Sequence, residues 1–356
     1  MQNVTLVGID LGKNVFHLHG QDRSGQQVFR KKVGRTQLLG FCADLPPCTV
    51  SMEACGGAHF LARELSALGH DVKLISPQFV RPFVKSSKND FVDAEAICEA
   101  TCRPSMRFVA PKSESQQSLS ALHSVRQSLM QDRIRTGNQI HALLLEFGIS
   151  LPRGANMAKH LPTVLAGQAL PSAMIALIGR LHEHFKYLHA QIASIEKELL
   201  VHLSANALAQ RLLTIPGIGP ITASALIGEM GEGLQFACGR DFAAWLGLVP
   251  RQRSTGGKTT LLGIRKGTGK PLRTLLILCA RSYMLRIGKQ SGPLAEWVRS
   301  LMSRRPSNIV ACALANKLAR IAWAVARQHT RFEPHPVRRQ YAGATPDREP
   351  RPLPDC

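Results

Sequence analysis

The spacing of apolar residues changes once along the 356-residue chain, and this change constrains the fold more than any other feature. Up to Ile75, short β-type runs separated by turn residues are typical of strands: VTLVGI, VFHLHG, QQVFRKK, CTVSME and DVKLI. Between the last two runs, residues 57–69 have helical spacing. Three strands followed by strand, helix and strand predict an α/β fold, with a mixed sheet that helices cover.

A helical pattern replaces the strands after Ser115. Apolar side chains recur at intervals of three and four in two stretches, at Leu119, Leu122, Val125 and Leu129, and at Leu177, Leu181, Phe185, Leu188, Ile192, Ile195 and Leu199. This spacing predicts two long amphipathic helices, a coiled-coil stalk in which core packing explains every leucine. Gly, Pro and Asn residues at 148–162 predict a connection that lets the second helix fold back or extend to a partner subunit.

The net charge indicates the kind of partner. The chain has 45 Lys and Arg against 24 Asp and Glu, which gives a net charge of +21 and a pI of about 10.2. Residues 206–329 hold 18 of these basic residues and only 4 acidic ones. Such a field concentrates polyanions, so we expect the C-terminal half to bind double-stranded DNA. The spread of the basic residues, without a terminal amphipathic anchor, argues against a membrane-surface protein.

Cysteines and apolar runs bear on the compartment. Nine cysteines form no C-x-x-C pair, and their odd number without a signal peptide predicts a reducing cytosol. Residues 308–326 are apolar but contain Lys317 and Arg320, which predicts a core helix and not a membrane span. Residues 331–356 hold six prolines and few apolar residues, which predicts a disordered tail.

Four acidic residues stand out in the first part of the chain. Asp10 ends the first predicted strand, and Glu53 ends the fourth in the same way. Asp90 and Asp93 are three residues apart at the start of a predicted helix, so they project from one face. A carboxylate among apolar residues is costly unless it holds a cation. Four converging carboxylates are what two divalent metals need in phosphodiester chemistry, and we expect Mg²⁺ or Mn²⁺.

Each acid also has a simpler explanation. Asp90 and Asp93 near a helix N-terminus would interact favourably with the helix dipole. Asp10 in the sequence GIDLG also fits the phosphate-binding strand of actin-like and sugar-kinase folds, but those folds need a second nucleotide domain that the sequence does not show. Only the combination of the four acids favours catalysis over these alternatives.

Two features mark the basic C-terminal part, and the first lies within residues 212–231. The letters IPGIGP form a turn that is followed by a helix, which is the helix-hairpin-helix pattern. Backbone amides at Gly217 and Gly219 would hold a DNA phosphate at the helix N-terminus. The alternative is a plain helix pair in which glycine allows close packing.

The second feature is the stretch GLVPRQRSTGGKTTLLGIRKGTGKPLR. It contains seven basic residues and no acidic one between its first and last arginines, namely Arg251, Arg253, Lys258, Arg265, Lys266, Lys270 and Arg273. We expect a loop that is attracted to phosphates, in which Ser254, with Thr255 beside it, offers a hydroxyl nucleophile among stabilising cations. Gln252 replaces the glycine that a P-loop requires. A flexible turn without chemistry is the alternative.

Taken in order, these motifs resemble one family. GID at Asp10, ME at Glu53, D-x-x-D at Asp90 and Asp93, IPGIG and GLVPRQRSTGGK follow one another as in the DEDD transposases of bridge-RNA insertion sequences, relatives of the Piv DNA invertase. The resemblance covers nearly the whole chain before the tail. It implies a RuvC-like, ribonuclease-H-like catalytic domain over 1–114, a coiled-coil stalk over 115–205, a transposase domain over 206–330 and a tail over 331–356.

The resemblance also implies roles and partners. The four acids become metal ligands, and Ser254 becomes covalently linked to DNA. A homodimer that assembles to a tetramer would act with a structured noncoding bridge RNA that pairs with donor and target DNA, in the bacterial cytoplasm at the nucleoid. Family members often have Ser-Ser or a single Ser before the glycine, so Thr255 leaves the register of the nucleophile open by one residue.

Two other functions fit part of the pattern. A hydrolytic RuvC-like junction resolvase would use the same acids with water as the nucleophile. A non-catalytic architectural DNA-binding protein would leave Asp10 and Glu53 unexplained.

Overall fold

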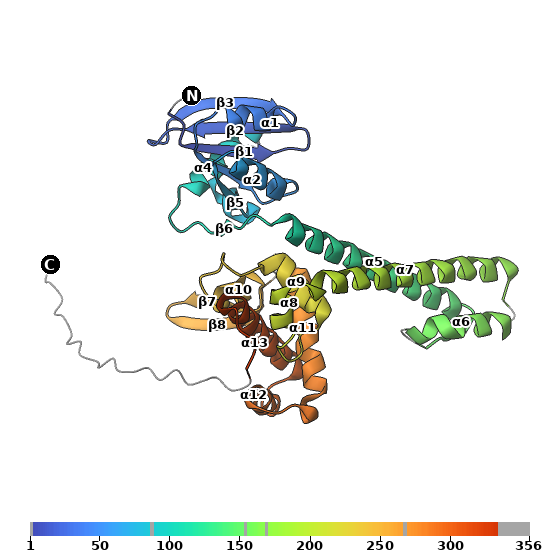
Figure 1. Ribbon diagram of the computed structural model, residues 1–356. Coiled ribbons are helices and arrows are strands. Elements are labelled where there is room, and N and C mark those ends of the chain that lie inside the picture. The colour runs from blue at the N-terminus through green and yellow to red at the C-terminus, as the bar shows by residue number, and fades with distance from the viewer. Residues whose placement is uncertain (1–2, 86–88, 153–154, 168–169, 266–268, 334–356) are drawn as a thin grey trace, which may run out of the picture.

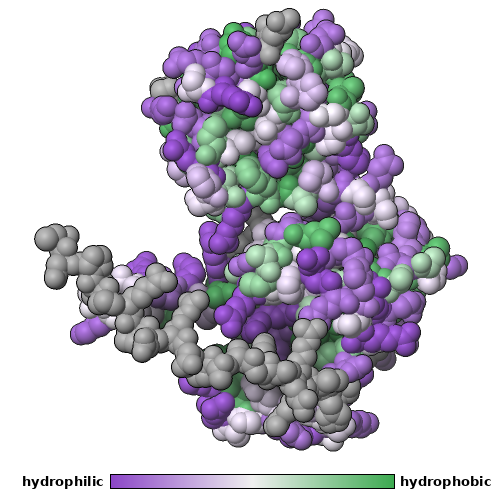
Figure 2. Space-filling model, turned by 60° about the vertical axis from the view of Figure 1, so that its left-hand side comes forward, coloured by the Kyte–Doolittle hydropathy of each residue, from purple (hydrophilic) through white to green (hydrophobic). Residues whose placement is uncertain are grey.

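A computed structural model describes residues 3–85, 89–152, 155–167, 170–265 and 269–333. The chain begins with a sheet domain, continues into a long helical arm and ends in a mostly helical domain (Figure 1). The sheet domain is a separate lobe in the space-filling view, and hydrophilic side chains cover much of both lobes (Figure 2).

The N-terminal sheet is mixed, as its sequence predicts. Its six strands lie in the order β3-β2-β1-β4-β5-β6. They are β1 (Leu6–Leu11), β2 (Val15–Gln21), β3 (Gln27–Gly34), β4 (Thr49–Glu53), β5 (Asp71–Ile75) and β6 (Phe108–Val109). β1, β4 and β5 run parallel, whereas β2, β3 and β6 pair antiparallel with their neighbours. The first five strands match the five predicted runs, so the α/β fold is confirmed.

Helices cover both faces of this sheet. On one face, α1 (Leu38–Ala43) and α2 (Ala58–Ala67) share a core with alternate strand residues such as Val7, Ile9 and Met52. On the other face lies α4 (Asp90–Thr101), after the short α3 (Pro77–Val80) and a 3-10 turn at Arg81–Phe83. The sequence pattern predicts α2 but not the six-residue α1 or the four-residue α3.

Gly8 allows α4 to pack directly on β1. A Cβ atom at this position would lie 2.3 Å from the carbonyl oxygen of Ala94 and 2.7 Å from the Sγ of Cys98, both on α4. Real Cβ atoms do not approach backbone oxygens so closely. A side chain at residue 8 would therefore push the helix away from the sheet.

The arm consists of three helices. α5 (Glu114–Leu145) begins at a capping box formed by Ser113 and Gln116, and α7 (Ser172–Ser204) packs along it (Figure 1). With a rise of about 1.5 Å per residue, each of these helices is about 50 Å long. Both confirm the two long helices that the apolar spacing predicts.

The far end of the arm has a small core of its own. The connection between the two long helices contains α6 (Ala155–Gly167), which the sequence pattern does not predict because Pro162 lies inside it. Met157 and Leu161 of α6 are buried against the end of α5 and the start of α7, at Leu144 and Ile178. These buried contacts hold α6 in place although proline is unfavourable within a helix.

Within its described residues, the C-terminal domain packs six helices and one two-stranded hairpin. They are α8 (Ala207–Leu212), α9 (Pro220–Met230), α10 (Gly239–Trp245), β7 (Pro250–Thr255), β8 (Lys258–Ile264), α11 (Lys270–Leu285), α12 (Pro293–Met302) and α13 (Ser307–Gln328), with a 3-10 turn at Ile287–Lys289. Leu119 of α5 and Leu199 and Leu203 of α7 belong to the same core. One end of the arm is therefore packed into the core of this domain.

By length and composition, α13 is the one helix among the described residues that could cross a membrane, but half of its most apolar window is buried in the protein. Val310, Leu314 and Leu318 are fully buried in the core of the C-terminal domain. The prediction of a core helix at 308–326 agrees with this packing.

One residue near the start of the predicted tail contacts the C-terminal domain. Phe332 packs against the C-terminal core, and its backbone N–H donates a hydrogen bond to the hydroxyl of Thr214 at 2.8 Å. Phe332, two residues into the predicted tail, is therefore held against the folded domain by an aromatic side chain and one hydrogen bond. The remainder of the predicted tail, 334–356, lies outside the described residues.

Polar contacts join α5 to α9 where the arm enters the C-terminal domain. His123 Nε2 lies 2.8 Å from the hydroxyl of the buried Ser224, which donates its own hydrogen to the carbonyl of Ile221. His123 is therefore the donor in this pair. Burial, and then the nearby Arg126 guanidinium, lowers the pKa of His123 to about 4.

We expect the substitution Gly8→Ala to lower the free energy of unfolding by about 1–3 kcal/mol, because the new methyl group overlaps α4. Urea denaturation followed by circular dichroism measures this change. Gly40→Ala is the matched control, since Gly40 lies in α1 and a Cβ atom added there would have no neighbour within 4 Å, and alanine favours helix at such a position. Equal stability of the two variants would contradict the close packing of α4.

Acid should weaken the junction of the arm. An unfolded histidine has a pKa near 6.5, whereas folded His123 has a pKa of about 4. Between these two values the unfolded state takes up the proton first, so stability falls as the pH is lowered from about 6.5 towards 4. His123→Gln keeps a donor for Ser224 without titrating. As the pH is lowered from about 6.5 to about 4, parallel urea titrations should show this variant gaining stability relative to the parent protein. A constant difference in the free energy of unfolding would contradict the lowered pKa of His123.

Candidate active site

Acidic side chains on two adjacent strands, β1 and β4, point towards α4. Asp10 lies two residues after Gly8 on β1, so it shares the face on which α4 packs. On β4, Glu53 lies two residues after Ser51, whose hydroxyl is 2.7 Å from that of Thr101 at the end of α4. Both predicted strand-end acids therefore face the same helix, and both are partly buried.

The first turn of α4 brings Asp90 and Asp93 to these strands. Asn89 caps the helix, because its side chain accepts a hydrogen bond from the Phe91 N–H at 3.0 Å. Asp90, at the start of the helix, lies beside Asp10 and His17. Ala94 and Cys98 lie over Gly8, and Thr101 lies over Ser51, so the helix begins at the Asp10 end and crosses from β1 to β4. The structure therefore brings the four predicted acids to one end of the sheet.

The charges of these acids act on one another. Burial raises the pKa of Glu53, and the negative charges of Asp10 and Asp93 raise it further. Like charges in a half-buried position are unfavourable unless a cation lies between them. A cation bound between these carboxylates would therefore lower their electrostatic repulsion.

His17 on β2 also belongs to this site, although no sequence motif marks it. It lies directly opposite Asp10 in the antiparallel pairing of β1 and β2. Its Nδ1 is 3.5 Å from an oxygen of Asp90, and its ring meets the ring of Phe91 edge-on with a centroid distance of 4.7 Å. The only signal in the sequence was the alternation in VFHLHG, which does not give the pairing with β1.

The donor atoms of Asp10, His17 and Asp90 fit a divalent cation. One ligand atom from each lies within 4.8 Å of the other two. Ligands of an octahedral ion at about 2.1–2.2 Å are about 3.0–4.4 Å apart. Small side-chain movements would therefore bring these three atoms to coordinating distance of one ion. Carboxylate oxygens and an imidazole nitrogen are donors that Mg²⁺, Mn²⁺ and related metals accept.

Ser254 lies on a β-hairpin and not in the irregular loop that the sequence predicts. β7 and β8 pair antiparallel with Ser254 opposite Thr259, and Gly256 and Gly257 form the turn with φ values of +55° and +74°. Two glycines at positive φ suit a two-residue hairpin turn. The prediction was wrong because basic residues obscured the alternation of the strands.

The hairpin exposes the serine and separates it from its neighbour. Every residue of β7 is exposed. The Ser254 hydroxyl accepts a hydrogen bond from the Gln252 side chain at 2.8 Å and lies 3.4 Å from the Thr259 hydroxyl. Successive strand residues face opposite sides, so Thr255 points away from the face that carries Ser254.

The predicted basic residues lie in different places. Arg251, Arg253 and Lys258 are exposed on the hairpin, Arg265 follows it, and Lys270 is the exposed first residue of α11. Arg253 and Lys258 lie on the face opposite Ser254 by strand alternation. Arg273 donates hydrogen bonds to the carbonyls of Arg265 at 2.7 Å and Leu246 at 3.3 Å, which gives it a structural role. Lys266 lies outside the described residues.

A groove of about 1550 Å³ runs between the base of the hairpin and α13. Residues Leu261 to Ile264 of β8 form one wall, and four cations line the groove, namely Arg240, Arg305, Lys317 and Arg320. Lys317 lies 4.3 Å from the ring centre of Trp297. The groove therefore combines positive charge with an aromatic surface, beside the hairpin that carries Ser254.

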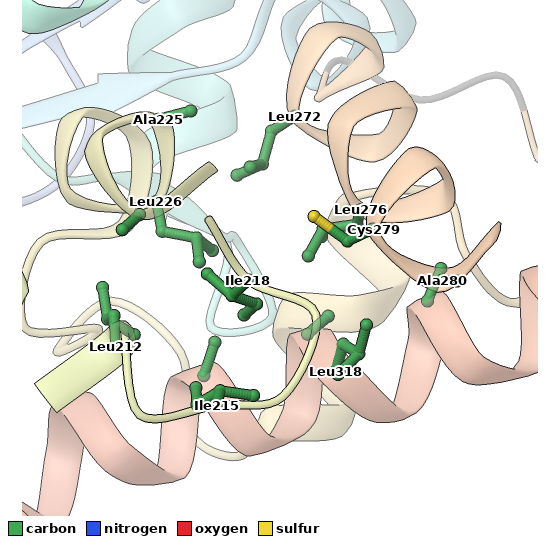
Figure 3. Close-up of a cluster of buried hydrophobic side chains, with 14 of the residues drawn as sticks. Leu212, Ile215, Ile218, Ala225, Leu226, Leu272, Leu276, Cys279, Ala280 and Leu318 are labelled. Carbon is green, nitrogen blue, oxygen red and sulfur yellow. The ribbon is translucent and has the colours of Figure 1, made fainter. Parts of the chain in front are cut away.

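The turn with the IPGIGP sequence packs into the C-terminal core. Ile215 and Ile218 are buried between α11 and α13, beside Leu276 and Leu318 (Figure 3). Gly217 has a φ of +86°, and a Cβ there would lie 3.3 Å from the carbonyl oxygen of Cys279. Gly219 starts α9 with no side chain that caps the helix. Close packing thus explains Gly217 in part, and the backbone N–H of Gly219, the residue before α9, is directed to the thiol of buried Cys279.

Comparison with known proteins gives the same family for both halves of the chain. Residues 7–149 match a family model of DEDD transposases of the IS110 type, described as a transposase. Residues 209–294 match the transposase IS116/IS110/IS902 family.

Individual relatives agree with these matches. The chain is 60% identical over 332 residues to the transposase for insertion sequence element IS1328 of Yersinia enterocolitica, which covers 93% of this chain and 99% of the relative. It is 40% identical to the transposase for insertion sequence element IS1111A of Coxiella burnetii, with 93% and 92% covered. A pilin gene-inverting protein of Moraxella bovis is 22% identical over 74% of this chain and 75% of its own length.

The identities and coverage confirm the resemblance to DEDD transposases of insertion sequences that the ordered motifs indicated. The first two relatives extend over the sheet domain, the arm and the C-terminal domain together. The chain therefore belongs to the IS110/IS116 family of transposases, enzymes that cut and rejoin DNA.

Proposed function

We propose that the four acids form a two-metal centre and that Ser254 is the nucleophile that becomes linked to DNA. The observation that carries this proposal is the meeting of strand-end and helix-start acids, Asp10 with Asp90, at one end of the sheet. An exposed serine on a separate hairpin is the second element. The sheet domain is RuvC-like in this proposal, with Mg²⁺ or Mn²⁺ as the metal.

The chemistry is two transesterifications. The Oγ of Ser254 attacks the scissile phosphorus and loses its proton, while the sugar oxygen of the neighbouring nucleotide leaves and gains one. The resulting phosphoserine then reacts with a free sugar hydroxyl of another strand, which restores the serine and joins the strands. One phosphorus–oxygen bond forms for each that breaks, so no external energy source is needed. Metals held by the four acids would polarise the phosphate and stabilise the charge on its oxygens.

Ser254 is a better candidate than Thr255. The two side chains face opposite sides of the hairpin. Ser254 has a primary hydroxyl, less hindered than that of threonine, and shares its face with Gln252 and Thr259, two further polar groups that can orient it. Its described hydrogen bonds stay within the hairpin, so it is exposed to an incoming strand.

The serine and the acids lie on different domains. We propose that an active site is completed between subunits of a homodimer, and that two dimers form a tetramer on donor and target DNA. The long arm, residues 115–205, would act as a coiled-coil stalk between the catalytic domain at 1–114 and the transposase domain at 206–330. Exposed apolar side chains on its helices, including Val125, Ile134 and Val201, offer contacts for a second subunit.

Nucleic acid would bind through the C-terminal domain. α8, the IPGIGP turn and α9 would act as a helix-hairpin-helix, with amides at Gly217 and Gly219 near a DNA phosphate. Exposed Arg251, Arg253 and Lys258 would contact phosphates along the hairpin, with Arg253 and Lys258 on the face opposite Ser254. A structured bridge RNA, which the resemblance implies, would use the same electrostatic attraction and would select donor and target by base pairing.

Trapping on labelled DNA tests the serine. The parent protein should form a DNA adduct that survives denaturation, and Ser254→Ala should abolish it because no hydroxyl remains. Thr255→Ala is the matched control and should retain most of the adduct. Loss of the adduct in Thr255→Ala alone would transfer the role to Thr255. A parent protein that cleaves DNA without any adduct would instead be a hydrolytic resolvase.

Metal dependence tests the acids. Asp10→Asn should reduce cleavage at least about a hundredfold and weaken Mg²⁺ or Mn²⁺ binding in calorimetry, because it removes a charged ligand at the point where β1 and α4 meet. Asp71→Asn is the control, since Asp71 starts β5 at the opposite end of the sheet and pairs with Lys73. Undiminished cleavage in Asp10→Asn would contradict the metal centre. A protein with no divalent-metal binding at all would favour an architectural DNA-binding role.

A further inference from the structure

The acids divide into two groups that share one member. Asp10, Asp90 and His17 bring their ligand atoms within 4.8 Å of one another. Glu53 follows Met52, the partner of Ile9, so it stands beside Asp10 on the neighbouring strand. Burial, and then the charges of Asp10 and Asp93, raise the pKa of Glu53. Asp10 therefore lies between a group that contains a nitrogen donor and a group that contains only oxygen donors.

Strand pairing fixes His17 in this position. Because residues 10 and 17 are direct partners in an antiparallel pair, their side chains leave the same face of the sheet a few ångströms apart. The His17 side chain is 14% exposed, and its ring makes a T-shaped contact with the ring of Phe91, which follows Asp90 on α4. The backbone of two strands and an aromatic contact from α4 thus hold the imidazole beside the two aspartates.

We propose that His17 is a ligand of one of the two metals, so that the centre has two unlike positions. The first position takes Asp10, Asp90 and the imidazole of His17, and the second takes Asp10, Glu53 and Asp93. This inference rests on the proposed metal centre and goes beyond it, since the four acids alone do not distinguish the positions.

A nitrogen ligand changes which metal is preferred. Mg²⁺ binds oxygen ligands almost exclusively in proteins, whereas Mn²⁺ and later transition metals also accept imidazole. The first position should therefore hold Mn²⁺ more tightly than Mg²⁺, while the second accepts either. A histidine that only formed an ion pair with Asp90 would give no such preference.

Pulsed electron paramagnetic resonance on the full-length protein with Mn²⁺ tests the ligand directly. A coordinated imidazole couples its ¹⁴N nucleus to the electron spin of Mn²⁺, so the parent protein should show ¹⁴N modulation. His17→Gln should lose this modulation, and so should His17→Asp, which supplies oxygen in place of nitrogen. His202→Gln, at an exposed position on α7, is the control and should keep it.

Calorimetry with the same variants gives a second measure. His17→Gln should bind Mn²⁺ at one position at least about tenfold more weakly, with a smaller change for Mg²⁺. His17→Asp should retain binding but lose the preference for Mn²⁺, which shows that the site still folds. Circular dichroism of each variant verifies the fold independently.

The outcomes separate this inference from the proposed function. Mn²⁺ that binds without ¹⁴N modulation in the parent protein, or modulation that persists in His17→Gln, would overturn the role of His17 and leave the four acids in place. If Mn²⁺ does not bind, and Asp10→Asn changes nothing, the proposed metal centre itself fails.

Discussion

The contact between Gly8 and the backbone of α4 sets the geometry of the N-terminal half. Without a side chain at residue 8, the helix lies directly on β1, and its first turn reaches the end of the strand where Asp10 stands. Because α4 lies so close to the sheet, the hydroxyl of Thr101 at its end also reaches the hydroxyl of Ser51 on β4. Four like charges then meet, three of them partly buried and that of Asp90 exposed. The apolar core on the opposite face, where Val7, Ile9 and Met52 pack, holds the strands in place against this repulsion.

Much of this fold follows from apolar periodicity, and the exceptions have identifiable causes. The first five strands, α2, α5 and α7 are long or regular enough for their periods to appear in the sequence. α1 and α3 are too short for a period to show, and α6 contains Pro162. In the hairpin, the alternation of polar and basic residues carries no apolar signal, because neither face of β7 is buried.

The candidate site also combines residues that the sequence predicts with one that it does not. Each of the four acids stands at a recognisable point, the end of a strand or the start of a helix, so local sequence predicts it. His17 is different, because its place depends on which residue of β1 it faces. That register is a property of the paired strands and not of either one. Arg273 shows the converse: its charge suggested phosphate binding, but two backbone carbonyls engage its guanidinium.

The two long helices join regions that are far apart. At one end, Leu119, Leu199 and Leu203 lie inside the core of the C-terminal domain, and at the other end Leu144 and Ile178 lie inside the small core with α6. Each helix is continuous between these cores. The arm therefore extends from the C-terminal domain as two continuous helices whose near ends pack against α9. A displacement of the end that carries α6 would therefore be transmitted along both helices to α9.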